Sequence, residues 1–201
     1  MARWEPNAAE RLARAALDLF FERGYDDTTV IDIAQRAGLG KSSFFRHFSD
    51  KREVLFGGPA MDELLAEAIA TAPASLTVLE AVGRALDAAG SAVFTPARRD
   101  TVMLRRAVIA ANPELREREA LKNLGLTASM TAALERRGVP GMTARVAAEL
   151  GAVAAAVGLE RWGQAANRTE FAVLARQALH DVEAAMASCA VPISTLRPAP
   201  S

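Results

Sequence analysis

The side chains best suited to bind an anionic partner are concentrated between positions 36 and 52. Five cations stand there against one acid, a net charge of +4: Arg36, Lys41, Arg46, Lys51 and Arg52 against Asp50. Three serines and a histidine lie among them. Lysine and arginine neutralise phosphates or reach guanine edges, and hydroxyl groups suit phosphate oxygens. On a chain of zero formal net charge this patch indicates an anion-binding surface, with an ordinary solvated run of charges as the alternative.

Enzymatic chemistry has no comparable support. The chain contains two histidines and one cysteine. His180 is followed by Asp181, but sequence neighbours do not share a helix face. No His or Cys cluster has metal-ligand spacing, and no glycine-rich loop follows a strand pattern. We therefore expect no catalytic residues, no metal and no cofactor.

The composition predicts an all-α protein. The 201 residues are 51% apolar but only 5% aromatic, and helix formers dominate over β-branched runs. The single Cys189 excludes an intrachain disulfide, which favours a reducing compartment. No apolar leader precedes residue 16, and the least polar run, 146–159, is shorter than the roughly 20 residues a membrane helix needs. We expect a cytoplasmic protein without a membrane partner, in which 146–159 is a deeply buried helix.

Short helices with clear start and stop signals are expected to carry the basic patch. A helix over 7–23 ends at Gly24, and a second begins at Thr29, which forms a capping box with Asp32. It ends at Gly38, and a third helix follows Gly40 and carries Phe44, Phe45 and Phe48. We take Phe44 and Phe48 as core residues. Asp50 caps the next helix, and Asn167 with Glu170 is expected to form another capping box. Two short helices joined by a tight turn predict a helix-turn-helix.

Residues 12–55 resemble the TetR family of transcription regulators. The family's pattern appears at Thr29, Val30, Ile33, Ala34, Ala37, Gly38, Leu39, Phe44, Phe48 and Lys51. The resemblance implies a three-helix DNA-binding domain over 1–50, a helical-bundle domain for ligand binding and dimerisation over 51–190, and a flexible tail over 191–201. It places the DNA contacts on Thr29, Lys41, Ser42, Ser43, Phe45, Arg46, His47 and Lys51.

Two positions depart from the family's pattern. Gly40 replaces the usual capping serine, and Phe45 replaces a tyrosine, so its ring has no hydroxyl for a phosphate. A second argument, independent of the resemblance, favours an anionic partner for Lys51: a cation in the first turn of a helix opposes the helix dipole, and an anionic partner would offset this.

The second half offers candidates for dimerisation. Val146, Leu150, Val153 and Val157 form a stripe, and small residues occupy the other sides of the same helix. A second stripe includes Phe171, Leu174, Ala178 and Val182. Together they suit a four-helix bundle made by two copies of the chain, with an intrachain core as the alternative.

Ligand-lining residues are harder to separate from the core. The resemblance suggests Met61, Leu65, Val82, Leu86, Phe94, Met103, Arg105, Arg106 and Ile109, although an apolar member of this set is more often plain core. Because Arg105 and Arg106 are adjacent, at least one of them should point inward or lie between two helices. A buried arginine needs an anionic partner, which favours an acidic or phosphate-bearing ligand. Segments 102–119 and 159–162 resemble a branch of actinobacterial regulators that includes the mycofactocin-system regulator, implying a long-chain acyl thioester or similar amphipathic ligand.

The sequence therefore predicts a homodimeric, ligand-responsive repressor that binds a palindromic DNA operator and is released by a small hydrophobic or amphipathic effector. The alternative is a helical binding module that no longer binds DNA. The intact polar set at positions 41, 42, 46, 47 and 51 favours the repressor.

Overall fold

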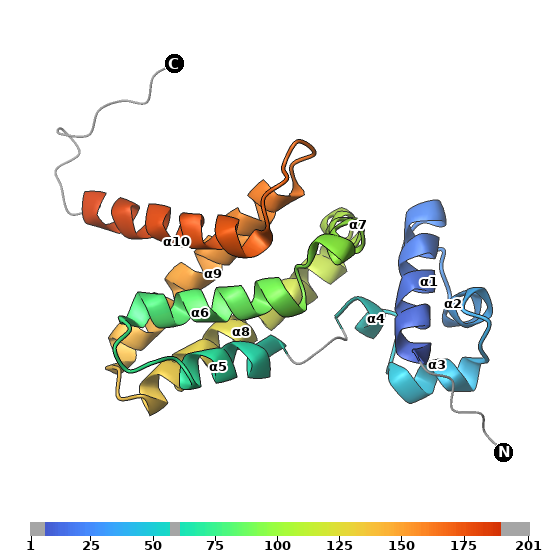
Figure 1. Ribbon diagram of the computed structural model, residues 1–201. Coiled ribbons are helices and arrows are strands. Elements are labelled where there is room, and N and C mark those ends of the chain that lie inside the picture. The colour runs from blue at the N-terminus through green and yellow to red at the C-terminus, as the bar shows by residue number, and fades with distance from the viewer. Residues whose placement is uncertain (1–6, 57–60, 190–201) are drawn as a thin grey trace. The chain divides into compact units, whose positions relative to one another are not determined.

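The structure is a computed structural model that describes residues 7–56 and 61–189. Every regular element in these ranges is a helix, which confirms the predicted all-α class (Figure 1). Packing divides the chain into two compact units, one built from residues up to 59 together with 97–122 and the other from 60–96 and from 123 onward. The predicted tail, 191–201, lies outside the described residues. The predicted limits 1–50 and 51–190 refer to functional domains and stay a prediction.

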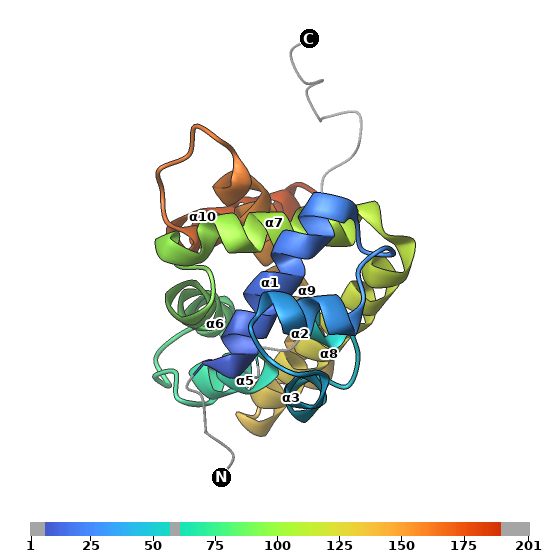
Figure 2. The ribbon, with the colours of Figure 1, turned by 90° about the vertical axis from the view of Figure 1, so that its right-hand side faces the viewer.

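The first unit surrounds one apolar core. Its helices are α1 (Ala8–Arg23), α2 (Val30–Arg36), α3 (Lys41–His47), α4 (Glu53–Phe56), α7 (Arg99–Ala111) and the first part of α8 (Pro113–Arg136). A short 3-10 turn, Pro96–Arg98, precedes α7. Figure 2 shows α2 and α3 beside α1. The core takes Leu12 and Phe20 from α1, Ile33 from α2, Phe44 from α3 and Leu115 from α8.

Local hydrogen bonds explain where these helices begin and end. The Thr29 hydroxyl accepts the Asp32 backbone N–H, while an Asp32 carboxylate oxygen accepts the Thr29 N–H at 2.9 Å. The predicted capping box is therefore confirmed. Asp50 caps α4 as expected, because its Oδ1 accepts the backbone N–H of both Arg52 and Glu53. Gly38 ends α2 with a φ of 68°, a conformation that glycine adopts without strain.

The second unit is a bundle in which helices approach closely through small residues. It contains α5 (Met61–Ala70), α6 (Val78–Ala92), the second part of α8, α9 (Gly141–Gly163) and α10 (Phe171–Ser188). A Cβ at Gly158 of α9 would lie 2.7 Å from the Cα of Ala175 on α10. The ion pair between Arg176 and Asp87 joins α10 to α6.

One predicted cap is wrong. No side chain caps α10, whose N-cap is Glu170. Asn167 instead bonds within its own loop, where its Oδ1 accepts the Thr169 N–H and its Nδ2 donates to the Thr169 carbonyl. Asparagine competes well for such local turns, and this turn takes the place of the capping box.

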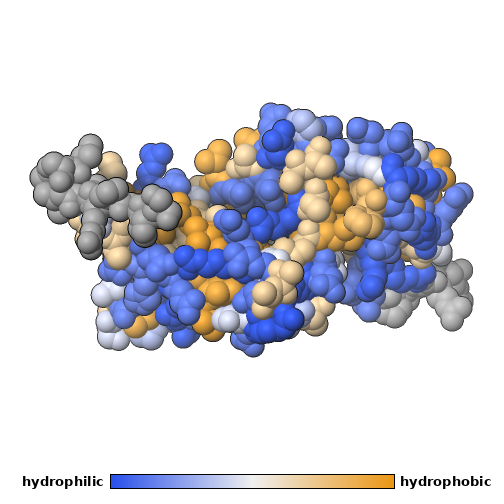
Figure 3. Space-filling view, turned by 90° about the horizontal axis from the view of Figure 1, so that it is seen from above, coloured by the Kyte–Doolittle hydropathy of each residue, from blue (hydrophilic) through white to orange (hydrophobic). Residues whose placement is uncertain are grey.

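Helix α9 has two different faces. Its small residues face inward, with Ala147, Ala148, Gly151, Ala154 and Gly158 all buried. Its branched residues face outward, and Val153 is 48% exposed. The prediction of a deeply buried helix is thus wrong for this side. Among the described residues α9 is the one helix long and apolar enough, by length and composition, to cross a membrane, and 33% of its most apolar window is buried. Apolar patches also interrupt the polar surface that Figure 3 shows.

Candidate nucleic-acid interface

The inner side of α3 fixes this helix against the first unit. Phe44 is fully buried, Phe48 just after the helix is 8% exposed, and their ring centroids lie 5.6 Å apart. This confirms the predicted core role of both rings. The turn before α3 is closed by the Leu39 backbone N–H, which donates to the Ala34 carbonyl at 2.8 Å. The orientation of α3 to α2 is therefore set by packing on one side and by the turn on the other.

The outer side of α3 carries most of the predicted DNA contacts. Lys41, Ser42, Phe45, Arg46 and His47 are exposed, and Ser43 is half-buried. The Lys41 ammonium lies 5.9 Å from the centroid of the Phe45 ring, and Arg46 donates to the Ser43 hydroxyl at 2.7 Å. No carboxylate of the described residues pairs with Lys41 or Arg46. The structure brings these six residues onto one short helix, and within 7–56 and 61–189 its two cations, Lys41 and Arg46, pair with no carboxylate.

Thr29 lies at the start of α2 with its hydroxyl already engaged. The hydroxyl donates to an Asp32 carboxylate oxygen at 2.5 Å. Hydrogen bonds from the Thr29 hydroxyl and backbone N–H hold the pKa of Asp32 below its usual value, with a further contribution from Arg23 at 3.1 Å. A phosphate contact from this hydroxyl would have to share it with the cap.

Lys51 differs from the other predicted contacts. It is half-buried, and its ammonium donates to the carbonyls of Tyr25, Asp26 and Thr28. Backbone oxygens within the same unit therefore give this cation partners without an anionic ligand, and the predicted DNA contact of Lys51 stays a prediction. Sequence reasoning missed Tyr25 and Arg11 as partners in this domain; Arg11 donates to the Ala37 carbonyl at the end of α2. Their acceptors are backbone carbonyls, which give no sequence signal.

The predicted ligand residues fall into both units. Met61, Leu65, Val82, Leu86 and Phe94 belong to the second unit, and Met103, Arg105, Arg106 and Ile109 to the first. Val82 is fully buried and Ile109 is 1% exposed. Phe94 packs on Phe171, with ring centroids 4.4 Å apart. The surroundings of these three side chains are those of core residues, which was the alternative to a ligand-lining role.

Arg105 points inward, as the adjacent arginines predicted, but it has partners within the chain. Its Nε donates to the Leu55 carbonyl, its Nη2 lies 3.8 Å from a Glu119 carboxylate oxygen, and its guanidinium lies 5.4 Å from the Phe56 ring centroid. Burial lowers the pKa of Arg105, against the opposing effect of Glu119. The need for an acidic ligand is thereby removed, because the chain itself supplies the negative charge.

The residues predicted to form the dimer interface differ in exposure between α9 and α10. On α9, Val146 and Val153 are exposed and Leu150 and Val157 are half-buried. On α10, Phe171 and Ala178 are buried, Leu174 is 9% exposed, and only Val182 is half-buried. The α10 stripe is therefore mostly intrachain core, the alternative that the sequence left open.

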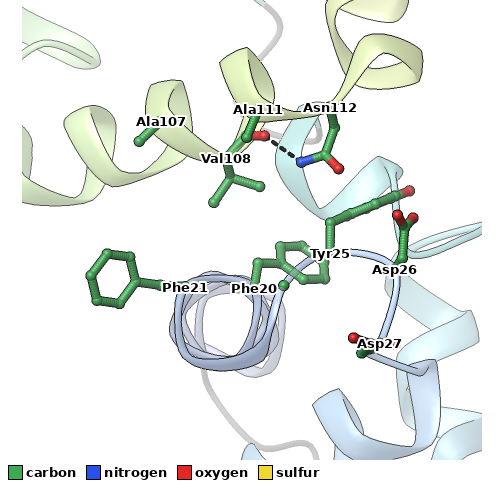
Figure 4. Close-up of a pocket in the computed structure, with 10 residues that line it drawn as sticks. Phe20, Phe21, Tyr25, Asp26, Asp27, Ala107, Val108, Ala111 and Asn112 are labelled. Atoms are coloured by element: carbon green, nitrogen blue, oxygen red, sulfur yellow. Dashed lines mark hydrogen bonds between the residues drawn. The ribbon is translucent and has the colours of Figure 1, made fainter.

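A cavity of about 340 Å³ lies elsewhere in the first unit. It lies between the end of α1, the loop after it and α7, and none of the predicted ligand residues lines it (Figure 4). Phe20, Phe21 and Tyr25 form its aromatic side, while the side-chain amide of Asn112, the C-cap of α7, donates to the Val108 carbonyl. No cluster of metal-binding side chains occurs within 7–56 and 61–189.

Comparison with known proteins agrees with this geometry. Residues 12–56 match the family model described as bacterial regulatory proteins, tetR family. The transcriptional regulator TcmR of Streptomyces glaucescens is 40% identical over 80 residues, which cover 39% of this chain and 35% of TcmR. The matched part thus spans about a third of that relative's length.

Solved structures share the fold over nearly the whole chain. A complex of SmeT with triclosan is 19% identical with a TM-score of 0.59, covering 96% of this chain and 99% of SmeT. The transcriptional repressor FadR of Thermus thermophilus, in complex with lauroyl-CoA, is 20% identical with a TM-score of 0.51 and the same coverage. The helix-turn-helix segment is therefore similar to the tetR family of bacterial regulatory proteins over residues 12–56, and the chain as a whole shares the all-helical TetR fold, with an N-terminal helix-turn-helix domain and a C-terminal helical domain.

Proposed function

We propose that the protein is a cytoplasmic, homodimeric repressor that binds a palindromic operator and is released by a small amphipathic ligand. The observation that carries the DNA-binding part is the outer side of α3, where Lys41 and Arg46 are exposed and no carboxylate in the part of the chain that the structure describes pairs with them. A short helix that is anchored by apolar rings and presents cations and hydroxyls suits the major groove and its phosphates.

Each predicted contact residue of α3 has a role in this proposal. Lys41 and Arg46 neutralise phosphates or reach guanine edges, and Ser42, Ser43 and His47 add hydrogen bonds. Phe45 has no hydroxyl and packs its ring, 49% exposed, against the sugar-phosphate backbone. Thr29 contributes from the start of α2.

Dimerisation is proposed through the outward face of α9. Val146, Leu150, Val153 and Val157 recur along this face, and a second copy would cover them and place two recognition helices about 34–36 Å apart. The exposed carboxylate of Glu149 in the middle of α9 favours a protein partner over lipid. Because most of the α10 stripe is intrachain core, the proposal rests on α9, with Val182 as the α10 contribution.

The effector is proposed to be amphipathic and to bind in the region after residue 51. Two proteins of this fold hold triclosan and lauroyl-CoA, and the second of these pairs an apolar chain with a polar head. An acyl thioester is the finer hypothesis, from the resemblance to the mycofactocin-system branch. Met61, Leu65 and Phe94 are the candidates to examine first, since they lie in the second unit. The effector would release DNA to the extent that it prefers the state that does not bind the operator.

The test is fluorescence anisotropy with the DNA upstream of the protein's own gene, at several salt concentrations, beside a scrambled duplex. We expect tighter binding to the upstream duplex and a linear fall of log K with log salt. Lys41→Ala should reduce the slope by about 0.9 per lost phosphate contact, or about 1.8 for a dimer. Arg84→Ala removes an exposed cation from α6 and should leave the slope unchanged. Equally weak binding to both duplexes would favour a helical binding module without this DNA activity.

A further inference from the structure

The ammonium group of Lys51 donates hydrogen bonds to the loop between α1 and α2. Its Nζ lies 2.8 Å from the Tyr25 carbonyl oxygen, 3.3 Å from that of Asp26 and 3.2 Å from that of Thr28. An ammonium group has three N–H donors, so these three acceptors use all of them. The loop and Lys51 belong to the same compact unit.

The same ammonium also contacts an aromatic ring. Its Nζ lies 4.1 Å from the centroid of the Tyr25 ring, within cation–π range. Tyr25 is 5% exposed, and its ring lies 5.1 Å from that of Phe20 on α1. Lys51 is therefore connected to the core through this ring as well as to the loop backbone.

The loop that Lys51 holds leads directly into α2. The Thr28 backbone N–H donates to the Tyr25 carbonyl, and the buried Thr28 hydroxyl donates to the Gly24 carbonyl at 2.8 Å. Thr29 follows as the N-cap of α2. Any displacement of the carbonyls at 25, 26 and 28 would move the cap, and with it the first turn of α2.

We propose that Lys51 is a positioning residue for DNA recognition: it holds the 24–29 loop, and through Thr29 the start of α2, and it makes no phosphate contact of its own. This inference rests on the proposed DNA-binding function and changes the role that the family resemblance gave to Lys51. A phosphate could take an N–H of Lys51 only by leaving one of the three carbonyls without its donor.

Two variants separate positioning from phosphate contact. Lys51→Met keeps a long apolar stem without donors, and Lys51→Gln is neutral but retains two N–H donors, which gives a second variant if the first does not fold. Lys41→Ala is the control for a lost phosphate contact. Hydrogen–deuterium exchange of the free protein and salt-dependent anisotropy are measured for each.

For positioning, both Lys51 variants should bind the operator more weakly with the wild-type salt slope. The amides of Thr28 and Thr29 should exchange at least about tenfold faster, because three hydrogen bonds to their loop are lost, while α9 keeps its protection. A slope reduced as in Lys41→Ala, with unchanged loop exchange, would overturn the inference. If the wild-type protein binds no DNA, the proposed function fails, and unchanged loop exchange in the variants would overturn the positioning role separately.

Discussion

The close approach of α9 and α10 gives the sharpest stability prediction. In Gly158→Ala the new Cβ would lie 2.7 Å from the Cα, 2.9 Å from the N and 3.0 Å from the Cβ of Ala175. These neighbours are backbone atoms or the first side-chain carbon, so they cannot turn away and the helices must separate. Overpacking of this kind costs about 1–3 kcal/mol.

Gly125→Ala is the matched control. Gly125 also lies inside a helix, α8, but is exposed, and a Cβ there meets nothing within 4 Å. Both substitutions gain about 1 kcal/mol of helix propensity, so Gly125→Ala should stabilise the protein by about that amount. The difference in unfolding free energy between the two variants then equals the overpacking cost, about 1–3 kcal/mol, each kcal/mol being about 2–4 °C in Tm. Denaturant and thermal unfolding followed by circular dichroism measure it. Equal stabilisation by both alanines would refute the close packing of α9 on α10.

Three further predictions follow from other contacts. Arg137 donates to backbone carbonyls at the end of α5, so Arg137→Ala should lower the free energy of unfolding by about 1–3 kcal/mol. The neighbouring Arg136 is exposed, and Arg136→Ala should have little effect. Denaturant unfolding of the two variants compares them. The pKa of Asp32 is lowered by hydrogen bonds from Thr29, so its contribution to stability is complete above the ordinary value of 3.8 and is lost as the pH falls through the lower folded-state pKa. Melting from pH 6 to pH 3 should accordingly be less pH-dependent in Asp32→Asn, and an unchanged pH dependence would argue against the capping box. Val153→Lys on the outward face of α9 should give monomers by light scattering, whereas Leu121→Lys, a similar change at a side chain 62% exposed on α8, should stay dimeric; a dimeric Val153→Lys would remove α9 from the interface.

The sequence predicted best what depends on near neighbours. The capping box of Thr29 and Asp32, the cap from Asp50 and the turn at Gly38 each involve residues within a few positions of one another, so residue type is enough. The core role of Phe44 and the exposure of the α3 cations follow from helical periodicity.

Contacts between distant residues and backbone atoms were not predictable in the same way. Lys51 and the Tyr25 carbonyl are 26 positions apart, and a carbonyl is present at every residue, so nothing in the sequence marks the acceptor. One of Arg105 and Arg106 was expected to point inward, but neither the choice of Arg105 nor its partner Glu119 on the next helix was identified.

The sequence left open whether the valine stripe of α9 packs within the chain or against a second copy. The small residues and the valines both form helical stripes, and the choice between them depends on how closely the partner helix approaches. Gly158 fits against Ala175 of α10, which turns the glycine side inward and leaves Val153 outside. That is a property of two helices together and cannot be read from one.

The central claim, that the outer side of α3 faces DNA, is tested most directly by photo-crosslinking. A benzophenone amino acid replaces Phe45 on α3 or, as the matched position, Phe21 on α1; the two rings are 49% and 72% exposed. The proteins are irradiated on the upstream duplex under conditions of specific binding. Our account predicts a crosslink to the operator from position 45 that competing unlabelled operator removes, and none from position 21. A crosslink from position 21 with none from position 45 would contradict it.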